Sequence, residues 1–319
     1  MVRAAQTSLR AEPTEKSREI AVLQKGQTLT DLGEVSRTES EIALGGEVVQ
    51  SPWIKVQTPE NQTGWVLAWA LRPALESKDW LLQKRLSGYF GEAGASRRNA
   101  LCRAFPNLET EGQLADAWRE ANTLRDTFLL LLSHRPQGGF QPQFSWLSEL
   151  LPGFLFQKME EGERPQLFAD FRVWRQMALK TTGKQDDAFL QTCLAAFPKD
   201  SIESFFPAWE FQISDTESAS QLGSGQHLKM LRHIGHSLQA APMFASQLEA
   251  FKEQVLEDVF GKNVRYWQPQ EKILGELAEI LADPPRCLST REREALGIRQ
   301  KMFEDPVGNG IRVNLRSGE

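Results

Sequence analysis

Three of the four histidines lie close together in the sequence and are the first side chains to consider for metal chemistry. His233 and His236 are three positions apart in a segment with helical apolar spacing, so they share a helix face, whereas His227 lies six positions earlier and points elsewhere. A zinc site recruits three or four ligands, and no aspartate or glutamate stands between Glu217 and Glu249 to complete one. We therefore predict no metal or other cofactor, and His233 and His236 are only weak metal candidates.

The cysteines and glycines do not form a recognisable catalytic motif. Cys102, Cys193 and Cys287 are widely separated and odd in number, so buried thiols are expected and at most one internal disulfide is possible. Gly223-Ser224-Gly225 lacks the Gly-x-Ser-x-Gly spacing of a nucleophile elbow. The glycines at 88, 91 and 94 neither follow a strand nor precede a Lys-Ser or Lys-Thr pair, so they predict a helix-to-helix turn and not a phosphate cradle.

Carboxylates could supply a general acid, but only in suitable surroundings. The pairs Glu160-Glu161 and Asp186-Asp187 stand in polar connections, where we expect helix caps and solvated loops. A helical enzyme of the muramidase type needs one buried glutamic acid in a cleft, and no apolar helix face in this sequence nominates one. We predict no catalytic residue, and an enzyme whose cleft only the tertiary structure would reveal stays open as an alternative.

The elements that would carry any site change character near residue 75. Before it the aromatic residues are Trp53, Trp65 and Trp69, whereas all 18 phenylalanines and both tyrosines follow it. The early segments 27–32 and 53–57 alternate at period two, as half-buried strands do, and Gly45-Gly46 separates two further strands as a tight hairpin turn. This change predicts a domain boundary.

The order of the early segments resembles that of the bacterial SH3 domain. The resemblance rests on Trp53-Ile54-Lys55-Val56, Gly64-Trp65-Val66 and Trp69-Ala70-Leu71, preceded by Leu9 to Pro13 and Ile20 to Leu29. It implies a five- or six-stranded barrel over about the first 70 residues, in a binding module that exported bacterial proteins often carry. Location in the periplasm or cell envelope follows from this resemblance alone. A cytoplasmic location is the alternative, because the chain shows no signal peptide.

The ligand of such a barrel would meet the tryptophans Trp53, Trp65 and Trp69. The resemblance also implies that the Gly-Trp-Val step is mainly structural, so at least one of these rings packs inside. Proline-rich peptides need an aromatic-lined groove, and the loop from Ser8 to Glu19 supplies no aromatic residue. The remaining ligands are a peptidoglycan fragment, a protein partner or the chain's own helical part.

After residue 75 the apolar spacing changes to three and four residues, which predicts seven to ten helices. Thr110 to Gln113 fits a capping box ahead of a long helix that ends before Pro136. Residues 200–203 would cap another helix with a kink at Pro207. Further helices are expected over residues 165–178, 186–197, 242–260, 269–282 and 289–303.

The last residues, 310–319, resemble the opening strand of the same barrel. Two placements stay open for them. They either pair with the edge of the barrel or form an extended strand on the surface.

Composition excludes several classes of protein. A chain of 319 residues with 40% hydrophobic and 25% charged residues is typical of a soluble globular protein of about two domains. The net charge of −5 argues against nucleic acid or an anionic membrane as partner. The longest apolar run, Phe128 to Leu132, is far shorter than the about 20 residues that cross a bilayer, so we predict no transmembrane segment.

The predicted fold is multidomain, α and β. An SH3-like β-barrel would span residues 1–75, an all-helical domain 76–304 and an extended tail 305–319. The predicted function is non-catalytic binding of a wall fragment or a protein partner in the bacterial cell envelope, with the helical domain as scaffold. The alternative is a cell-wall hydrolase in which the barrel is the targeting module and the helical domain holds the active site.

Overall fold

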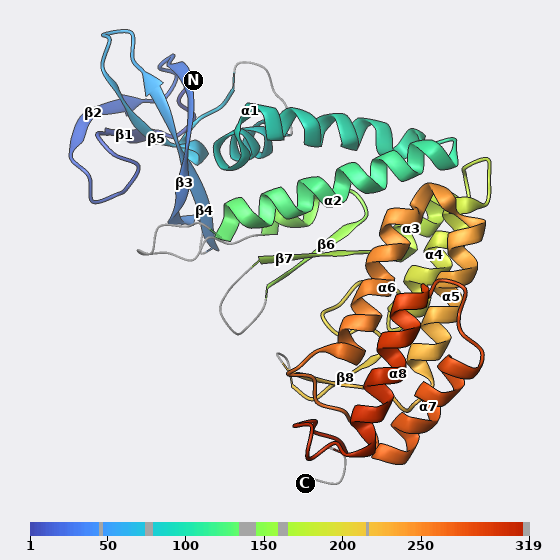
Figure 1. Cartoon of the computed structure of the whole chain (residues 1–319). Coiled ribbons are helices and arrows are strands. Elements are labelled where there is room, and N and C mark those ends of the chain that lie inside the picture. Colours follow the sequence, from blue (N-terminus) through green and yellow to red (C-terminus); the bar gives the residue numbers. More distant parts are fainter. Residues whose placement is uncertain (45–46, 74–78, 134–144, 159–164, 215–216, 315–319) are drawn as a thin grey trace. The chain divides into compact units, whose positions relative to one another are not determined.

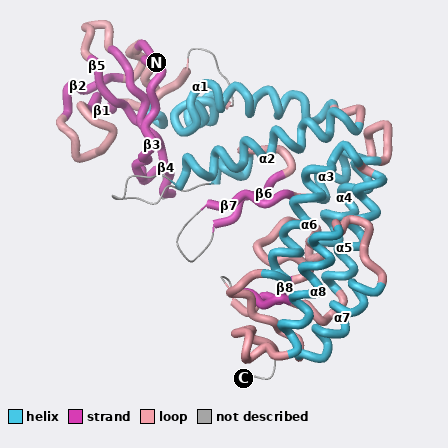
Figure 2. Tube along the Cα trace, in the orientation of Figure 1, coloured by secondary structure: helices cyan, strands magenta, loops and turns pink. Residues whose placement is uncertain are grey.

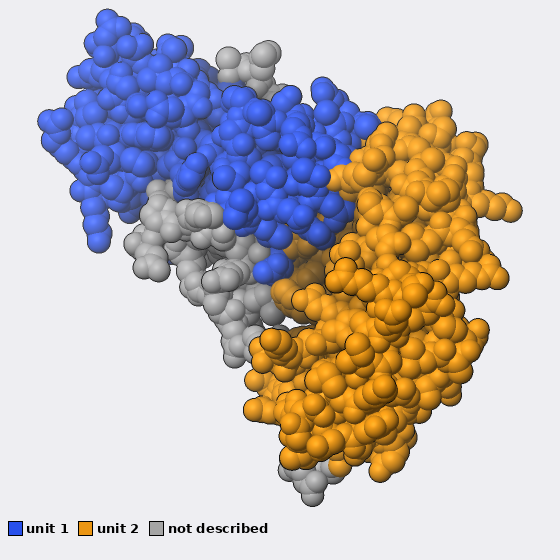
Figure 3. Space-filling view, viewed as in Figure 1, with its two compact units in different colours: residues 1–104, 120–152, 164–166 blue, residues 105–119, 153–163, 167–319 orange. Residues whose placement is uncertain are grey.

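The computed structural model describes residues 1–44, 47–73, 79–133, 145–158, 165–214 and 217–314. These residues fall into two compact units, coloured in Figure 3. Unit 1 comprises residues 1–104, 120–152 and 164–166, and unit 2 comprises 105–119, 153–163 and 167–319. No helix in the described part of the chain is both long and apolar enough to cross a membrane.

Unit 1 begins with a five-stranded antiparallel sheet in the order β2-β1-β5-β4-β3, seen at the blue end of the chain in Figure 1. The order places β5 beside β1, so the end of the segment closes against its beginning. The 3-10 helix η1 (Ala68–Ala70) follows the last strand. The strands are β1 (Gln6–Arg10), β2 (Glu19–Gln24), β3 (Thr30–Leu44), β4 (Glu47–Gln57) and β5 (Thr63–Leu67).

Alternation along the strands separates a core face from an outer face. Ile54 pairs with Val66 and both are fully buried, together with Leu9 and Leu23, in one apolar cluster. Gly64 is needed where β5 meets β1, because a Cβ there would lie 2.7 Å from the carbonyl oxygen of Arg10. This close approach explains the structural part of the Gly-Trp-Val step.

The ribbon formed by β3 and β4 was expected from the apolar segments on either side of Gly45-Gly46. The pairing is confirmed, since Leu44 lies opposite Glu47 and the ladder continues to Thr30 and Gln57. The glycine pair itself lies outside the described residues.

Helix α1 (Trp80–Ala104) packs against β3 within unit 1. A Cβ on Gly88 would lie 1.9 Å from Cγ1 of Val35, so only glycine allows this contact. The hydroxyl of Tyr89 donates to the carbonyl of Arg37 at 2.7 Å. Gly91 leaves the helical conformation at φ 72°, which produces the turn between two helical segments that the glycine spacing predicted.

The second part of unit 1 is held to α1 by aromatic and polar contacts. Helix α2 (Glu111–Ser133) contributes its residues from 120 onward, and Phe128 stacks on Phe90 with centroids 3.9 Å apart. The 3-10 helix η3 (Ser145–Glu149) ends near Leu150, whose carbonyl accepts from Nε of Arg98 at 2.7 Å.

At the start of α2 the amide of Gln113 donates to the hydroxyl of Thr110 at 3.2 Å, which confirms the capping box.

Unit 2 is mainly helical. Helix α4 packs on α5, α5 on α6 and α7, and α7 on α8. Its elements are η2 (Phe105–Asn107), β6 (Phe154–Lys158), β7 (Pro165–Ala169), α3 (Phe171–Ala178), α4 (Gln185–Ala196), β8 (Glu210–Gln212), β9 (Ser218–Ser220), α5 (Gln226–Ala240), η4 (Pro242–Phe244), α6 (Ala245–Phe260), α7 (Gln270–Ala282) and α8 (Thr290–Glu304).

The core of unit 2 is rich in aromatic rings. Trp118 meets Trp174 edge to face at 4.8 Å and Phe189 at 5.2 Å between centroids. Phe189 in turn stacks on Phe244 at 4.4 Å. The change in aromatic content near residue 75 therefore reflects a core built from large rings instead of the small aliphatic core of the sheet.

The fold class is confirmed: a small antiparallel β domain precedes eight α-helices in the described part of the chain. Figure 2 colours the strands magenta and the helices cyan. The predicted helices at 186–197, 242–260, 269–282 and 289–303 are present within a few residues. Four short strands, β6 to β9, also occur in the helical part.

The helix expected over 165–178 is present only from Phe171 to Ala178, and the helix expected to start at residues 200–203 is absent. Residues 165–169 form strand β7, and α3 begins only at Phe171 because Asp170 caps it, accepting from the amide of Arg172 at 3.0 Å. Residues 200–203 start no helix, since Asp200 and Ser201 adopt left-handed φ values of 56° and 55°. The chain there is held by backbone hydrogen bonds to residues 169–171.

The C-terminal residues pair within unit 2 as far as they are described. The amide of Tyr266 donates to the carbonyl of Arg312 at 2.8 Å, and the amide of Asn314 donates to Gln268 at 3.0 Å. Of the two placements expected for the tail, pairing with the barrel edge is therefore not observed for residues 310–314. Residues 315–319 lie outside the described part.

Candidate functional site

Trp53 is the least accessible of the three candidate tryptophans. Its side chain is 1% exposed, and it lies on the face of β4 opposite to Ile54. The ring nitrogen Nε1 donates to the hydroxyl of Ser40 at 3.0 Å, and the backbone amide donates to the hydroxyl of Ser36 at 2.8 Å. These bonds tie β4 to β3, so Trp53 has the packing role that the resemblance implied for at least one ring.

Trp65 lies half-buried at the centre of a row of side chains across three strands. Arg10 of β1 and Lys55 of β4 are its direct cross-strand neighbours, so all three lie on one face of the sheet. Nζ of Lys55 is 5.8 Å from the Trp65 ring centroid and 2.8 Å from a carboxylate oxygen of Glu34. Lys55 is thus paired with Glu34, and the Arg10 guanidinium donates to the carbonyl of Ser17 at 2.7 Å. The row presents an aromatic surface between two basic side chains, each of which keeps further N–H donors for a ligand carboxylate.

Trp69 lies half-buried on η1 and packs against the aliphatic core of the sheet. Its amide donates to the hydroxyl of Ser51 at 2.9 Å, and the guanidinium of Arg3 lies 5.1 Å from its ring centroid. Trp65 and Trp69 thus both retain accessible ring surface next to a cation.

Residues 5–72 match the family model of the bacterial SH3 domain. The barrel is a bacterial SH3 domain. Such domains are typically cell-wall-binding modules, they commonly bind peptidoglycan or proteins, and they often occur in exported proteins. None of the curated proteins and none of the solved structures compared with the chain matches it.

Beyond the SH3 domain, the two metal candidates lie on the exposed side of α5. His233 and His236 are one helical turn apart, as their spacing predicted. Partial desolvation lowers the pKa of His233, and Lys229 and His236 act in the same direction. In the described part of the chain, no three histidine, cysteine, aspartate or glutamate side chains converge on a metal site.

All three cysteines are free thiols with raised pKa values. Burial raises the pKa of Cys287 to about 11 and that of Cys193 well above its usual range. Burial also raises the pKa of Cys102, against the opposing charge of Arg98. A nucleophilic cysteine needs a stabilised thiolate, and none of these environments provides one.

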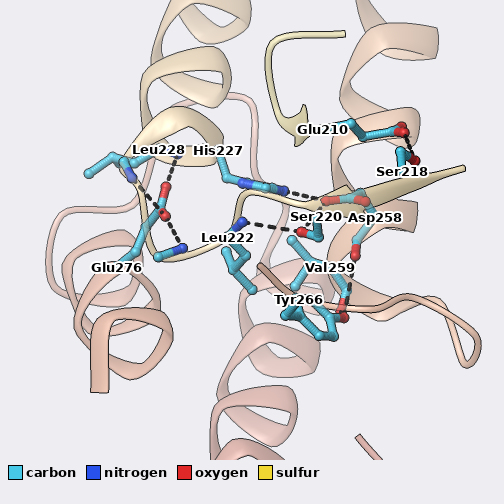
Figure 4. A network of polar contacts seen from close by, with 12 residues as sticks. Glu210, Ser218, Ser220, Leu222, His227, Leu228, Asp258, Val259, Tyr266 and Glu276 are labelled. Carbon is cyan, nitrogen blue, oxygen red and sulfur yellow. Dashed lines mark hydrogen bonds and ion pairs between the residues drawn. The ribbon is translucent and has the colours of Figure 1, made fainter. Parts of the chain in front are cut away.

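The sequence did not indicate the buried polar network of unit 2 that Figure 4 shows. Asp258 of α6 accepts from Nε2 of His227 at 2.7 Å and from the hydroxyl of Ser220 at 2.5 Å through the same oxygen. The hydroxyl of Tyr266 donates to the carbonyl of Val259 at 2.8 Å. The serine is bonded to the aspartate and not to the histidine, so this arrangement is not a catalytic triad and instead fastens β9 and α5 to α6.

Glu276 of α7 organises the start of α5 in the same region (Figure 4). Its buried carboxylate accepts from the amides of Gly225 and Leu228, each at 2.9 Å, and from the amide of Gly223. A negative charge at a helix N-terminus is stabilising, so Gly223-Ser224-Gly225 is a helix-start loop.

Glu210 of β8 stands at the edge of the network. Its carboxylate accepts from the hydroxyl of Ser218 at 2.5 Å, and its pKa is raised by burial and by the charge of Asp258, while the Ser218 bond and His227 oppose the shift. No local pattern marked this residue, because its surroundings come from β9, α5 and α6.

Proposed function

We propose that the chain is a non-catalytic binding protein of the bacterial cell envelope whose SH3 domain recognises a carboxylate-bearing ligand, first of all a peptidoglycan fragment. The observation that carries the proposal is the row of Arg10, Trp65 and Lys55 on the outer face of the sheet. Trp69 with Arg3 supplies a second aromatic surface of the same kind. An envelope location is part of this proposal, and it rests on the family of the domain.

A half-buried indole offers a rigid apolar surface at small entropic cost, and aromatic and arginine side chains dominate binding energies. Trp53 lies on the same face of β4 as Lys55 but is buried, so in this proposal it packs beside the binding surface and does not meet the ligand directly.

Sedimentation of the full-length protein with purified insoluble peptidoglycan tests the proposal. We expect the wild type to co-sediment, and Trp65→Ala to bind about tenfold less tightly, since a hot-spot tryptophan contributes more than about 1 kcal/mol. Val22→Ala is the matched control, because it removes an exposed apolar side chain from β2 of the same sheet. Lys55→Glu keeps Trp65 and should also weaken binding if the ligand is anionic.

The outcomes separate the remaining interpretations. Failure of the wild type to sediment would reject peptidoglycan and leave a protein partner as the ligand. Release of soluble fragments during the incubation would reject the non-catalytic proposal in favour of the alternative, a cell-wall hydrolase.

A further inference from the structure

Unit 2 contains a cavity of about 890 Å³ on the side of β8. Its wall is built from the end of α4, the connection 197–208, strand β8 and the start of α5, with single residues from β6 and β7. This volume is in the range of sites that hold small organic ligands.

An exposed aromatic ring marks one side of the cavity. Phe205 is 44% exposed, and it is fixed edge to face against Phe168 with centroids 5.0 Å apart. Phe206 lies beside it at 6.4 Å between centroids. A rigid ring that faces a cavity instead of the core offers a surface for an apolar ligand face.

Free amide side chains line the same cavity. Gln157, Gln212, Gln221 and Gln226 contribute to its wall, and within the described residues their side-chain amides form no hydrogen bond to the protein. Each amide offers one acceptor and two donors, so the four together can bind a ligand that is rich in hydroxyl or amide groups.

The charges of the wall nearly balance. Lys199 and Lys229 stand against the carboxyl groups of Asp200, Glu203 and Glu210. Glu203 and Glu210 are partly buried, and burial raises the pKa of the Glu210 carboxyl group. The lining therefore disfavours a phosphate or a strongly charged ligand.

The loop that carries Phe205 is preorganised. Asp200 and Ser201 hold consecutive left-handed conformations, which persist only where the surroundings impose them. The carbonyl of Ser201 accepts from the amide of Phe171 at 3.0 Å, and Glu203 bonds the backbone of Ala169 through both its amide and its carboxylate, each at 2.9 Å. A fixed wall reduces the entropic cost of binding.

We propose that this cavity binds a neutral glycan chain, with a sugar ring packed on Phe205 and ring hydroxyls bonded to the glutamine amides and to Glu210. Sugars combine apolar C–H faces with many hydroxyl groups, and the wall offers one aromatic ring together with several planar amides and a carboxyl group. This site is separate from the outer face of the SH3 domain, and the inference does not depend on what that domain binds.

Isothermal titration calorimetry of the full-length protein with the tetrasaccharide of N-acetylglucosamine tests the inference. We expect saturable binding to the wild type and at least about fivefold weaker binding to Phe205→Ala, the effect of losing an aromatic contact worth about 1 kcal/mol. Ile298→Ala is the control, because this side chain is exposed on α8 and does not line the cavity. Gln212→Ala removes one amide and leaves the Phe205 ring in place, so it should also weaken binding.

Two results would overturn the inference. One is the absence of saturable binding to the wild type, and the other is equal affinity of the wild type and Phe205→Ala. A short uncharged tetrapeptide serves as the competing probe, and binding of that peptide without binding of the glycan would reject the glycan in favour of a peptide. Circular dichroism melts of each variant distinguish lost binding from lost folding.

Discussion

At the scale of single residues, buried carboxylates in this protein accept two or three hydrogen bonds each and so join helices and strands that are distant in the sequence. Asp258 accepts from Nε2 of His227 and from the hydroxyl of Ser220 through one oxygen, and Glu276 accepts from three amides at the start of α5. A buried carboxylate is tolerated only when such donors replace its water. These contacts give the buried carboxylates a role in joining β9 and α5 to α6, and α5 to α7.

Asp170 makes the clearest test of such a role. It is 4% exposed, caps α3 by accepting from the Arg172 amide at 3.0 Å, and pairs with the Arg172 guanidinium at 2.7 Å. We expect Asp170→Ala to lower the free energy of unfolding by about 1–2 kcal/mol at pH 7, as loss of an N-cap does. Urea denaturation measures the difference. Asp116→Ala is the control, because it removes an aspartate from an exposed ion pair worth little.

The pH dependence of this effect has a defined sign. The hydrogen bond from Arg172 lowers the pKa of Asp170, and the helix amides act in the same direction against burial. The stabilisation is therefore complete above the unfolded pKa of about 3.9 and is lost as the pH falls through the lower folded value. The gap between wild type and Asp170→Ala should close in that acidic range, and a constant gap down to low pH would contradict this account.

The candidate sites differ in how far sequence alone could reach them. Trp65 was found because the order of short strands around it is a local pattern. Glu210 and Phe205 were missed, because their surroundings come from segments that are distant along the chain. Burial of a glutamate between β9, α5 and α6 leaves no periodicity in its own segment, so only the tertiary structure identifies it.

At the scale of elements, local signals for a helix start were right at some positions and wrong at 200–203, where the expected cap starts no helix. Thr110 caps its helix as predicted, and Ser289 caps the helix expected over 289–303, since a side-chain oxygen bonds the next turn in each case. They failed at 165–169, where apolar residues could be read as a helix but pair with β6 as a strand. A short apolar run cannot be assigned by periodicity alone, because pairing partners decide it.

Gly88 tests how α1 docks on the sheet. Because a Cβ at this position would overlap Cγ1 of Val35, we expect Gly88→Ala to destabilise the protein by about 1–3 kcal/mol through overpacking, despite the better helix propensity of alanine. Thermal or urea unfolding measures the change. Gly275→Ala in α7 is the matched control, since a Cβ there meets nothing within 4 Å, and it should stabilise by about 1 kcal/mol. Equal behaviour of the two variants would show that α1 does not rest on β3 as described.

At the scale of the whole molecule, the sheet and α1 belong to one compact unit, although the predicted domain boundary lies between them. Arg85 bonds the buried carboxylate of Glu39 at 3.1 Å, and Tyr89 donates to Arg37. Trp80 and Leu81 pack against the core cluster of the sheet. The boundary near residue 75 stays a prediction, and these contacts argue that the SH3 domain depends on α1.

Comparison of two fragments, residues 1–73 and 1–104, decides between an autonomous and a dependent SH3 domain. Removing α1 uncovers Val35, whose burial contributes about 1.5–3 kcal/mol, and takes away the Tyr89 and Arg85 bonds to β3. A small domain has only about 5 kcal/mol of stability to lose. We therefore expect fragment 1–73 to unfold at a clearly lower urea concentration than fragment 1–104. Circular dichroism of the sheet monitors the unfolding of both fragments. Equal midpoints would instead support a boundary near residue 75, because the sheet would then hold its fold without the helix that covers β3.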